Sequence, residues 1–156
     1  MFLWMYWPSF NSALLDDNSK HRAIVNTTYS MSTSTIGCLL TSMLLHKGKM
    51  NAEQIINGSL AGGIMIGASA DMIVSPFISL IIGFCGGILS TLGIHFLEQP
   101  AYKYLYLHDT AAIAWVHFVP GFIGGLISAL IAGVTPEREF GNDIQNVFKY
   151  MGPGYD

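Results

Sequence analysis

The sequence predicts an all-α protein, folded as a polytopic bundle of transmembrane helices. Its 156 residues are 51% hydrophobic, and only 11% carry a charge, whereas a soluble domain usually carries roughly 25% charged residues. Long stretches without Asp, Glu, Lys or Arg approach the about 20 apolar residues that a helix needs to cross a bilayer. These stretches are 23–45, 54–70, 72–97 and 111–135. A helix in lipid satisfies its own backbone hydrogen bonds, so a bilayer is the expected surrounding.

Helical segments follow one another along the chain with short polar loops between them. We expect them at about 1–14, 22–45, 53–71, 74–97 and 110–134, all within one membrane domain of residues 1–135. The first is apolar but too short to span, and resembles half of a spanning helix. Pro76 is expected to open the fourth helix, where a missing N–H is tolerated. Residues 136–156 are expected to form a polar tail.

Small residues recur at every fourth position in the last three segments. The rows are Ser59, Gly63 and Gly67; Gly83, Gly87 and Thr91; and Gly121, Gly125, Ala129 and Gly133. Residues spaced by four share a helix face, and small side chains let helices approach closely in lipid. The rows therefore predict a tightly packed bundle, in which any passage between helices is narrow.

Ionisable residues at membrane depth are costly and often functional, and His117 is the main example. It is interpreted either as a pore residue or as a neutral histidine bonded to a neighbouring helix. Asp109 lies eight residues earlier, which places it on nearly the same face, about 12 Å away along the helix. With Thr110, it also suits the N-cap of that helix.

Aromatic residues crowd the first segment, and they indicate either an interfacial belt or an aromatic gate over a pore. They are Phe2, Trp4, Tyr6, Trp7 and Phe10. Other classes of function lack support in the residues. Cys38 and Cys85 form no CxxC pair, so neither a metal nor another cofactor is expected. No nucleophile accompanies His117 as in an enzyme, and no basic cluster indicates nucleic acid.

Four stretches together resemble the Rh glycoprotein branch of the ammonium transporter family. They are LWMYWPSFNSA, HKGKMNAEQIINGSLAGG, LIIGFCGGILSTLG and HDTAAIAWVHFVPGFIGG, and the resemblance covers nearly all of residues 2–133. It implies a C-terminal-half fragment of that family's transmembrane bundle. It also implies a plasma-membrane protein, a homotrimer or an assembly with related subunits, and passage of ammonia or ammonium through a narrow apolar pore. Carbon dioxide is a further substrate that the sequence does not separate from ammonia.

The resemblance also implies roles for particular residues at the outer end of the pore. Phe10 matches one of two phenylalanines that close the pore, and Trp7 matches an aromatic residue of the outer vestibule. Asn11 is the polar residue beside this gate. An aromatic face can hold a cation at the pore mouth before the cation loses its water.

Three further residues are implied in the helix that carries the histidine. His117 matches the second of a pair of pore histidines, Asp109 matches the acidic residue before it, and Ile113 matches an apolar lining residue. An ammonium ion pays a heavy desolvation cost in an apolar tube, whereas neutral ammonia pays little. Neutral imidazoles can bond ammonia and share a proton.

The surroundings of His117 depart from the Rh pattern and support an alternative function. Ala114 and Trp115 stand where polar residues are usual, and Phe118 follows the histidine in place of a glycine. Phe118 adds bulk that could obstruct a passage. The alternative is therefore a non-conducting structural or regulatory subunit of an Rh-type assembly.

Overall fold

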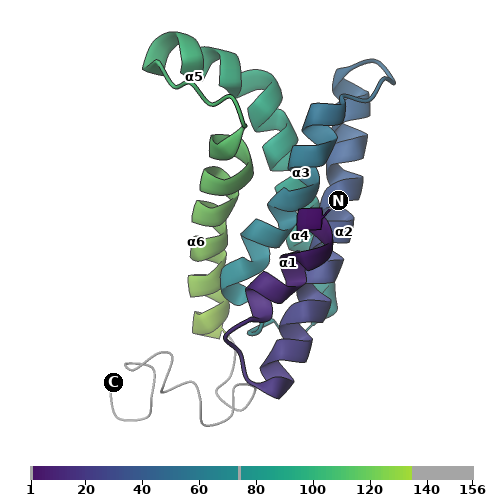
Figure 1. Cartoon of the computed structure of the whole chain (residues 1–156), viewed down its shortest axis with the longest axis vertical. Coiled ribbons are helices and arrows are strands. Elements are labelled where there is room, and N and C mark those ends of the chain that lie inside the picture. The colour runs from purple at the N-terminus through teal and green to yellow at the C-terminus, as the bar shows by residue number, and fades with distance from the viewer. Residues whose placement is uncertain (1, 74, 135–156) are drawn as a thin grey trace.

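The computed structural model describes residues 2–73 and 75–134, which form a bundle of long helices (Figure 1). The helices in chain order are α1 (Phe2–Ser12), α2 (Asp17–Leu45), α3 (Ala52–Ile66), α4 (Pro76–Leu92), α5 (Glu98–Leu105) and α6 (Val119–Val134). A 3₁₀ turn, η1 (Gly67–Ser69), follows α3, and two π-helical turns, η2 (Gly93–Leu97) and η3 (Ala114–Phe118), precede α5 and α6. The all-α bundle is confirmed, whereas the tail predicted at 136–156 lies outside the described residues.

Two of the predicted loops are partly helical. α2 begins at Asp17 after an extended Asp16, five residues before the expected start at 22, because acidic residues favour a helix N-terminus. The expected loop EQPAYKYLYLHD instead begins with α5, which continues directly from η2. Pro100 is the third residue of α5, directly after the π-helical turn, and the chain continues as a helix through it.

Two of the four predicted spanning stretches, those in α4 and α6, form helices with the length and composition of a membrane span. α1 has 11 residues, or about 16 Å, roughly half of a bilayer core of about 30 Å. The continuous helices Pro76–Leu105 and Ala114–Val134 are long and apolar enough to cross a membrane. Pro76 is the first residue of α4, as predicted.

Close approach through small residues joins α2, α3 and α4. A Cβ atom on Gly83 or Gly87 of α4 would overlap a backbone carbonyl oxygen of Ser30 or Ser34 in α2. The Ser34 hydroxyl donates to the carbonyl oxygen of Gly58 in α3 at 2.6 Å. Small residues and buried hydroxyls are the typical means of joining helices in lipid, so the prediction of tight packing is confirmed for this row.

The predicted row on α6 is not a packing surface within the described chain. Cβ atoms on Gly125 or Gly133 would meet no described atom within 4 Å, and one on Gly121 would meet only Ile64, at 3.8 Å. Gly124 is the close-contact glycine instead, since its Cβ would overlap the carbonyl of Met65 in α3. Successive helix residues point about 100° apart, so a one-residue difference in register moves the contact to another face.

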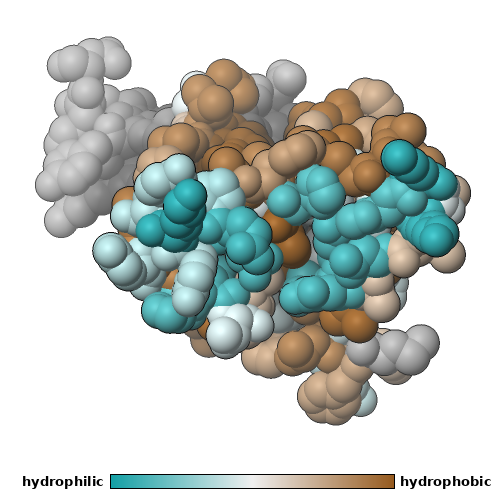
Figure 2. Space-filling model, turned by 90° about the horizontal axis from the view of Figure 1, so that it is seen from above, coloured by the Kyte–Doolittle hydropathy of each residue, from teal (hydrophilic) through white to brown (hydrophobic). Residues whose placement is uncertain are grey.

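Polarity is distributed as expected for a protein in lipid. Along the sides of α4, η3 and α6, large apolar side chains are exposed: Phe77, Ile78, Ile81, Phe84, Phe118, Phe122, Leu126 and Leu130. Viewed from the end that carries α5, hydrophilic side chains form a band across the face, with hydrophobic ones mostly above and below it (Figure 2). This end of the bundle therefore suits water, and the sides suit hydrocarbon.

Candidate functional site

Three aromatic rings from two distant parts of the chain form a row. The ring centroids of Phe10 and Trp7, both on α1, are 5.8 Å apart. The edge of the Trp7 ring then meets the His117 ring of η3, with centroids 6.2 Å apart. Phe10 and His117 are exposed at the two ends of the row. The structure thus brings together Phe10, Trp7 and His117, which the resemblance had assigned to one passage.

A glycine on α3 makes room for the middle ring of this row. A Cβ atom on Gly63 would lie 2.6 Å from Cδ1 of Trp7 and 3.0 Å from Cγ of Met31. Any larger residue at this position would displace the indole. Within the described residues, the buried indole N–H of Trp7 has no hydrogen-bond acceptor, and its nitrogen lies 2.9 Å from the Cβ position of Gly63.

Asn11 fastens α1 to the rest of the bundle. Its amide nitrogen donates to the hydroxyl of Thr27 in α2 at 3.1 Å and to the carbonyl of Gly63 in α3 at 3.0 Å. Both amide hydrogens therefore have protein partners. The side chain fixes the helix that presents Phe10 and Trp7, and only its carbonyl oxygen is left for another partner.

Asp109 accepts hydrogen bonds from the first N–H groups of the helix that carries His117, although η3 begins at Ala114 and not at about 110 as predicted. Its two carboxylate oxygens accept from the backbone N–H groups of Ile113 at 2.8 Å and Ala114 at 2.7 Å. The chain between them turns through Ala112, which has a left-handed φ of 53°. Ile113 is exposed. The cap holds the start of η3, and hence His117, at a fixed depth in the bundle.

Phe118 does not cover the row of rings. Its ring stacks on Phe122 of α6, with centroids 6.5 Å apart and 20° between the planes. Phe118 therefore extends along the exposed side of the helix. The described residues enclose no passage, so obstruction by Phe118 stays a prediction.

Other histidines lie away from the row of rings. The His95 ring in η2 meets the edge of His46 at 5.1 Å, and Nε2 of His46 lies 3.2 Å from Oε1 of Gln54. Nothing in the sequence indicated this contact, because the two histidines come from separate helices without a shared motif. Across residues 2–73 and 75–134, no three His, Cys, Asp or Glu side chains are grouped as metal ligands.

The fold and the site together define a class of protein. Apolar sides, glycine contacts and buried hydroxyls indicate a multi-pass membrane protein. The row of aromatic rings ends on an exposed histidine. The chain is thus a helical membrane protein of the multi-pass class.

The chain belongs to the Ammonium Transporter Family, whose sequence model matches residues 1–151. It is 41% identical to Ammonium transporter Rh type C of Tetraodon nigroviridis over 98% of its length, and 40% identical to human Rh type C over 97%. Rh type B of Papio hamadryas is 36% identical over 99% of the chain. The resemblance to the Rh branch is confirmed, and the family is one of transporters, not enzymes.

A solved structure supports the same conclusion for the fold. Rh50 of Nitrosomonas europaea, from a family of channels, matches 88% of this chain with a TM-score of 0.81 and 32% identity. The match covers 36% of the Rh50 chain. Likewise, the chain spans only 33% of the Tetraodon relative and 32% of the human one, or about a third of their length.

Proposed function

We propose that this chain forms one wall of a narrow apolar passage for ammonia and ammonium in an Rh-type channel. The observation that carries the proposal is the row of rings from Phe10 through Trp7 to His117. Phe10 is 64% exposed and His117 is also exposed, so a small molecule can reach both side chains from outside the described helices. Membership in the ammonium transporter family supports ammonia as the substrate.

The row offers the groups that ammonia needs at successive positions. The face of Phe10 attracts a cation near the mouth, and the apolar row beyond it favours the neutral gas, because charge is costly to desolvate. His117 is exposed and can bond ammonia as donor or acceptor according to its tautomer, whereas the indole N–H of Trp7 is buried against Gly63 of α3. Asn11 and Asp109 act indirectly, since their polar groups already hold α1 and η3.

A complete passage needs a second wall from outside the described residues. No described residue covers the exposed sides of the Phe10 and His117 side chains. An unsatisfied polar group that faces lipid has a free energy of transfer that is unfavourable by several kcal/mol. We infer that the wall comes from an assembly, either a homotrimer or an association with related subunits, in the plasma membrane. The chain by itself should conduct ammonia far more slowly than a complete family member.

Proteoliposomes with an internal pH dye and an imposed ammonium gradient test this proposal. The chain alone should give slow alkalinisation. Co-expression with the N-terminal portion of an Rh-type relative should give fast alkalinisation, which His117→Asp abolishes. His108→Gln is the matched control, because His108 is exposed in the loop before η3, and it should leave the rate unchanged.

Other results would contradict the proposal in different ways. Fast alkalinisation by the chain alone, abolished by His117→Asp, would show that one chain encloses the whole passage. Absence of conduction in every assembly that forms would favour the alternative, a structural or regulatory subunit. An imposed carbon dioxide gradient, followed as acidification by the same dye, separates that gas from ammonia.

A further inference from the structure

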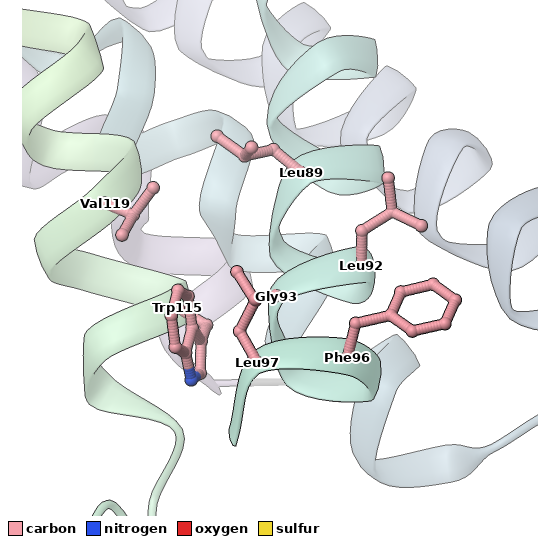
Figure 3. Close-up of a pocket in the computed structure, with 7 residues that line it drawn as sticks. All are labelled: Leu89, Leu92, Gly93, Phe96, Leu97, Trp115 and Val119. Carbon is pink, nitrogen blue, oxygen red and sulfur yellow. The ribbon is translucent and has the colours of Figure 1, made fainter. Parts of the chain in front are cut away.

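The two π-helical turns meet through one tight contact. Trp115, in η3, lies against Gly93, the first residue of η2 (Figure 3). A Cβ atom on Gly93 would lie 2.7 Å from Cε3 and 3.0 Å from Cδ2 of the Trp115 indole. Because a rigid bicyclic ring cannot bend away at these distances, only glycine at position 93 admits the indole in its present position.

His117 lies within the same π turn as Trp115, so its direction depends on that turn. The N–H of Val119 bonds the carbonyl of Ala114, five residues back, and this inserts one extra residue into the helical turn. After this π turn, α6 is held against η1, because the Ser128 hydroxyl donates to the carbonyl oxygen of Ala68 at 2.9 Å. Loss of the extra residue would rotate the start of the helix by about 100° relative to this anchor.

We infer that Trp115 is a positioning residue. Its indole packs on Gly93, and this contact holds η3 in the π-helical form. That form turns the His117 side chain toward Trp7. The inference concerns the direction of the imidazole, and its importance for transport rests on the proposed function. Within the described residues the indole N–H of Trp115 has no hydrogen-bond partner. Shape therefore holds the indole, and another flat aromatic ring should serve in its place.

A pocket beside the indole makes the contact testable. It has a volume of about 230 Å³ and is lined by Leu89, Leu92, Gly93, Phe96, Leu97, Trp115 and Val119. In Figure 3, Leu97 and Val119 flank the indole at this pocket. A methyl group added at Gly93 can push the ring into this space without driving the helices apart. Gly93→Ala should therefore fold while moving Trp115.

Solid-state NMR on the full chain in lipid bilayers, with ¹³C and ¹⁵N labels on Trp and His, measures the direction of His117. The wild-type chain should show a cross-peak between the Trp7 and His117 rings, whose centroids lie 6.2 Å apart. Loss of this peak in the His117→Gln variant assigns it to His117. Gly93→Ala and Trp115→Ala should remove most of its intensity, and Trp115→Phe should retain it. Gly125→Ala is the matched control, because a Cβ atom there meets no described atom within 4 Å.

The results separate this inference from the proposed function, because the cross-peak needs no conduction. An unchanged peak in both Gly93→Ala and Trp115→Ala would overturn the positioning role. A general change in the backbone chemical shifts of α2 and α3 would also overturn the positioning role, because Gly93 would then support the whole bundle and not His117 in particular. In an assembly that conducts, the pH profile of transport should shift in Gly93→Ala and stay unchanged in Gly125→Ala. If no assembly conducts, the proposed function fails while the cross-peak still decides the role of Trp115.

Discussion

Replacing Gly87 by alanine tests the contact on which the bundle depends. The new Cβ atom would overlap the carbonyl oxygen of Ser34 and lie 3.0 Å from the backbone nitrogen of Cys38. Both are backbone atoms of α2, so no side-chain rotation relieves the overlap. α2 is itself tied to α3, since the Ser34 hydroxyl also accepts from the N–H of Gly62 at 3.0 Å. The helices must therefore separate, and the hydrogen bonds between them must lengthen.

The expected loss in the free energy of unfolding follows from two opposing effects. Forcing an additional methyl group into a packed interior costs about 1–3 kcal/mol. In a helix, alanine is favoured over glycine by roughly 0.5–1 kcal/mol when nothing obstructs the methyl group. Gly125 is the unobstructed case, because nothing described lies within 4 Å of its Cβ position. Gly87→Ala should destabilise the fold, whereas Gly125→Ala should leave it unchanged or slightly more stable.

Equilibrium unfolding in mixed detergent micelles, followed by helicity, measures both variants on the same scale. The Gly87→Ala transition should move to lower denaturing detergent, and the Gly125→Ala transition should stay or move to higher. Equal stability of the two variants would refute the reasoning, because it would mean that α2 and α4 do not approach as closely as Gly87 and Ser34 indicate.

Two further substitutions test single hydrogen-bonding groups by the same unfolding measurement. Asp109→Ala removes both acceptor oxygens at the start of η3 and should lower the free energy of unfolding by about 1–2 kcal/mol. Asp109→Asn keeps one acceptor oxygen and should lower it less. An equal loss in the two variants would argue against capping. Asn26 is buried, and its amide donates to the carbonyls of Ala70 and Ile73 at 2.8 Å each. Asn26→Ala should therefore cost about 1–3 kcal/mol for each carbonyl left without a partner, and an unchanged transition would show that water replaces the amide.

Features that depend on neighbours in the sequence could be predicted without the structure. Pro76 opens α4, and Asp109 caps η3, because a helix end is decided by the backbone groups within one turn of it. The bundle itself follows from composition, since few charges and long apolar stretches leave lipid as the surrounding. The resemblance assigned Phe10, Trp7 and His117 to one passage, but it did not indicate that the Trp7 ring contacts both of the other rings.

Features that depend on the register between helices could not be predicted. The small residues of α6 offer several similar faces, and only packing against α3 selects Gly124 over Gly125. The contact of Trp115 with Gly93 has the same origin, since it joins two π turns from consecutive helices that share no sequence pattern.

The sequence by itself determined that this protein is a helical membrane bundle of the Rh type, and it placed the helix that carries the histidine. Only the tertiary structure decided which way His117 points, because that direction depends on an extra residue in one turn and on the ring that holds the turn. A rotation of about 100° per residue converts a small difference in register into a different face. Such a difference leaves no trace in composition or periodicity.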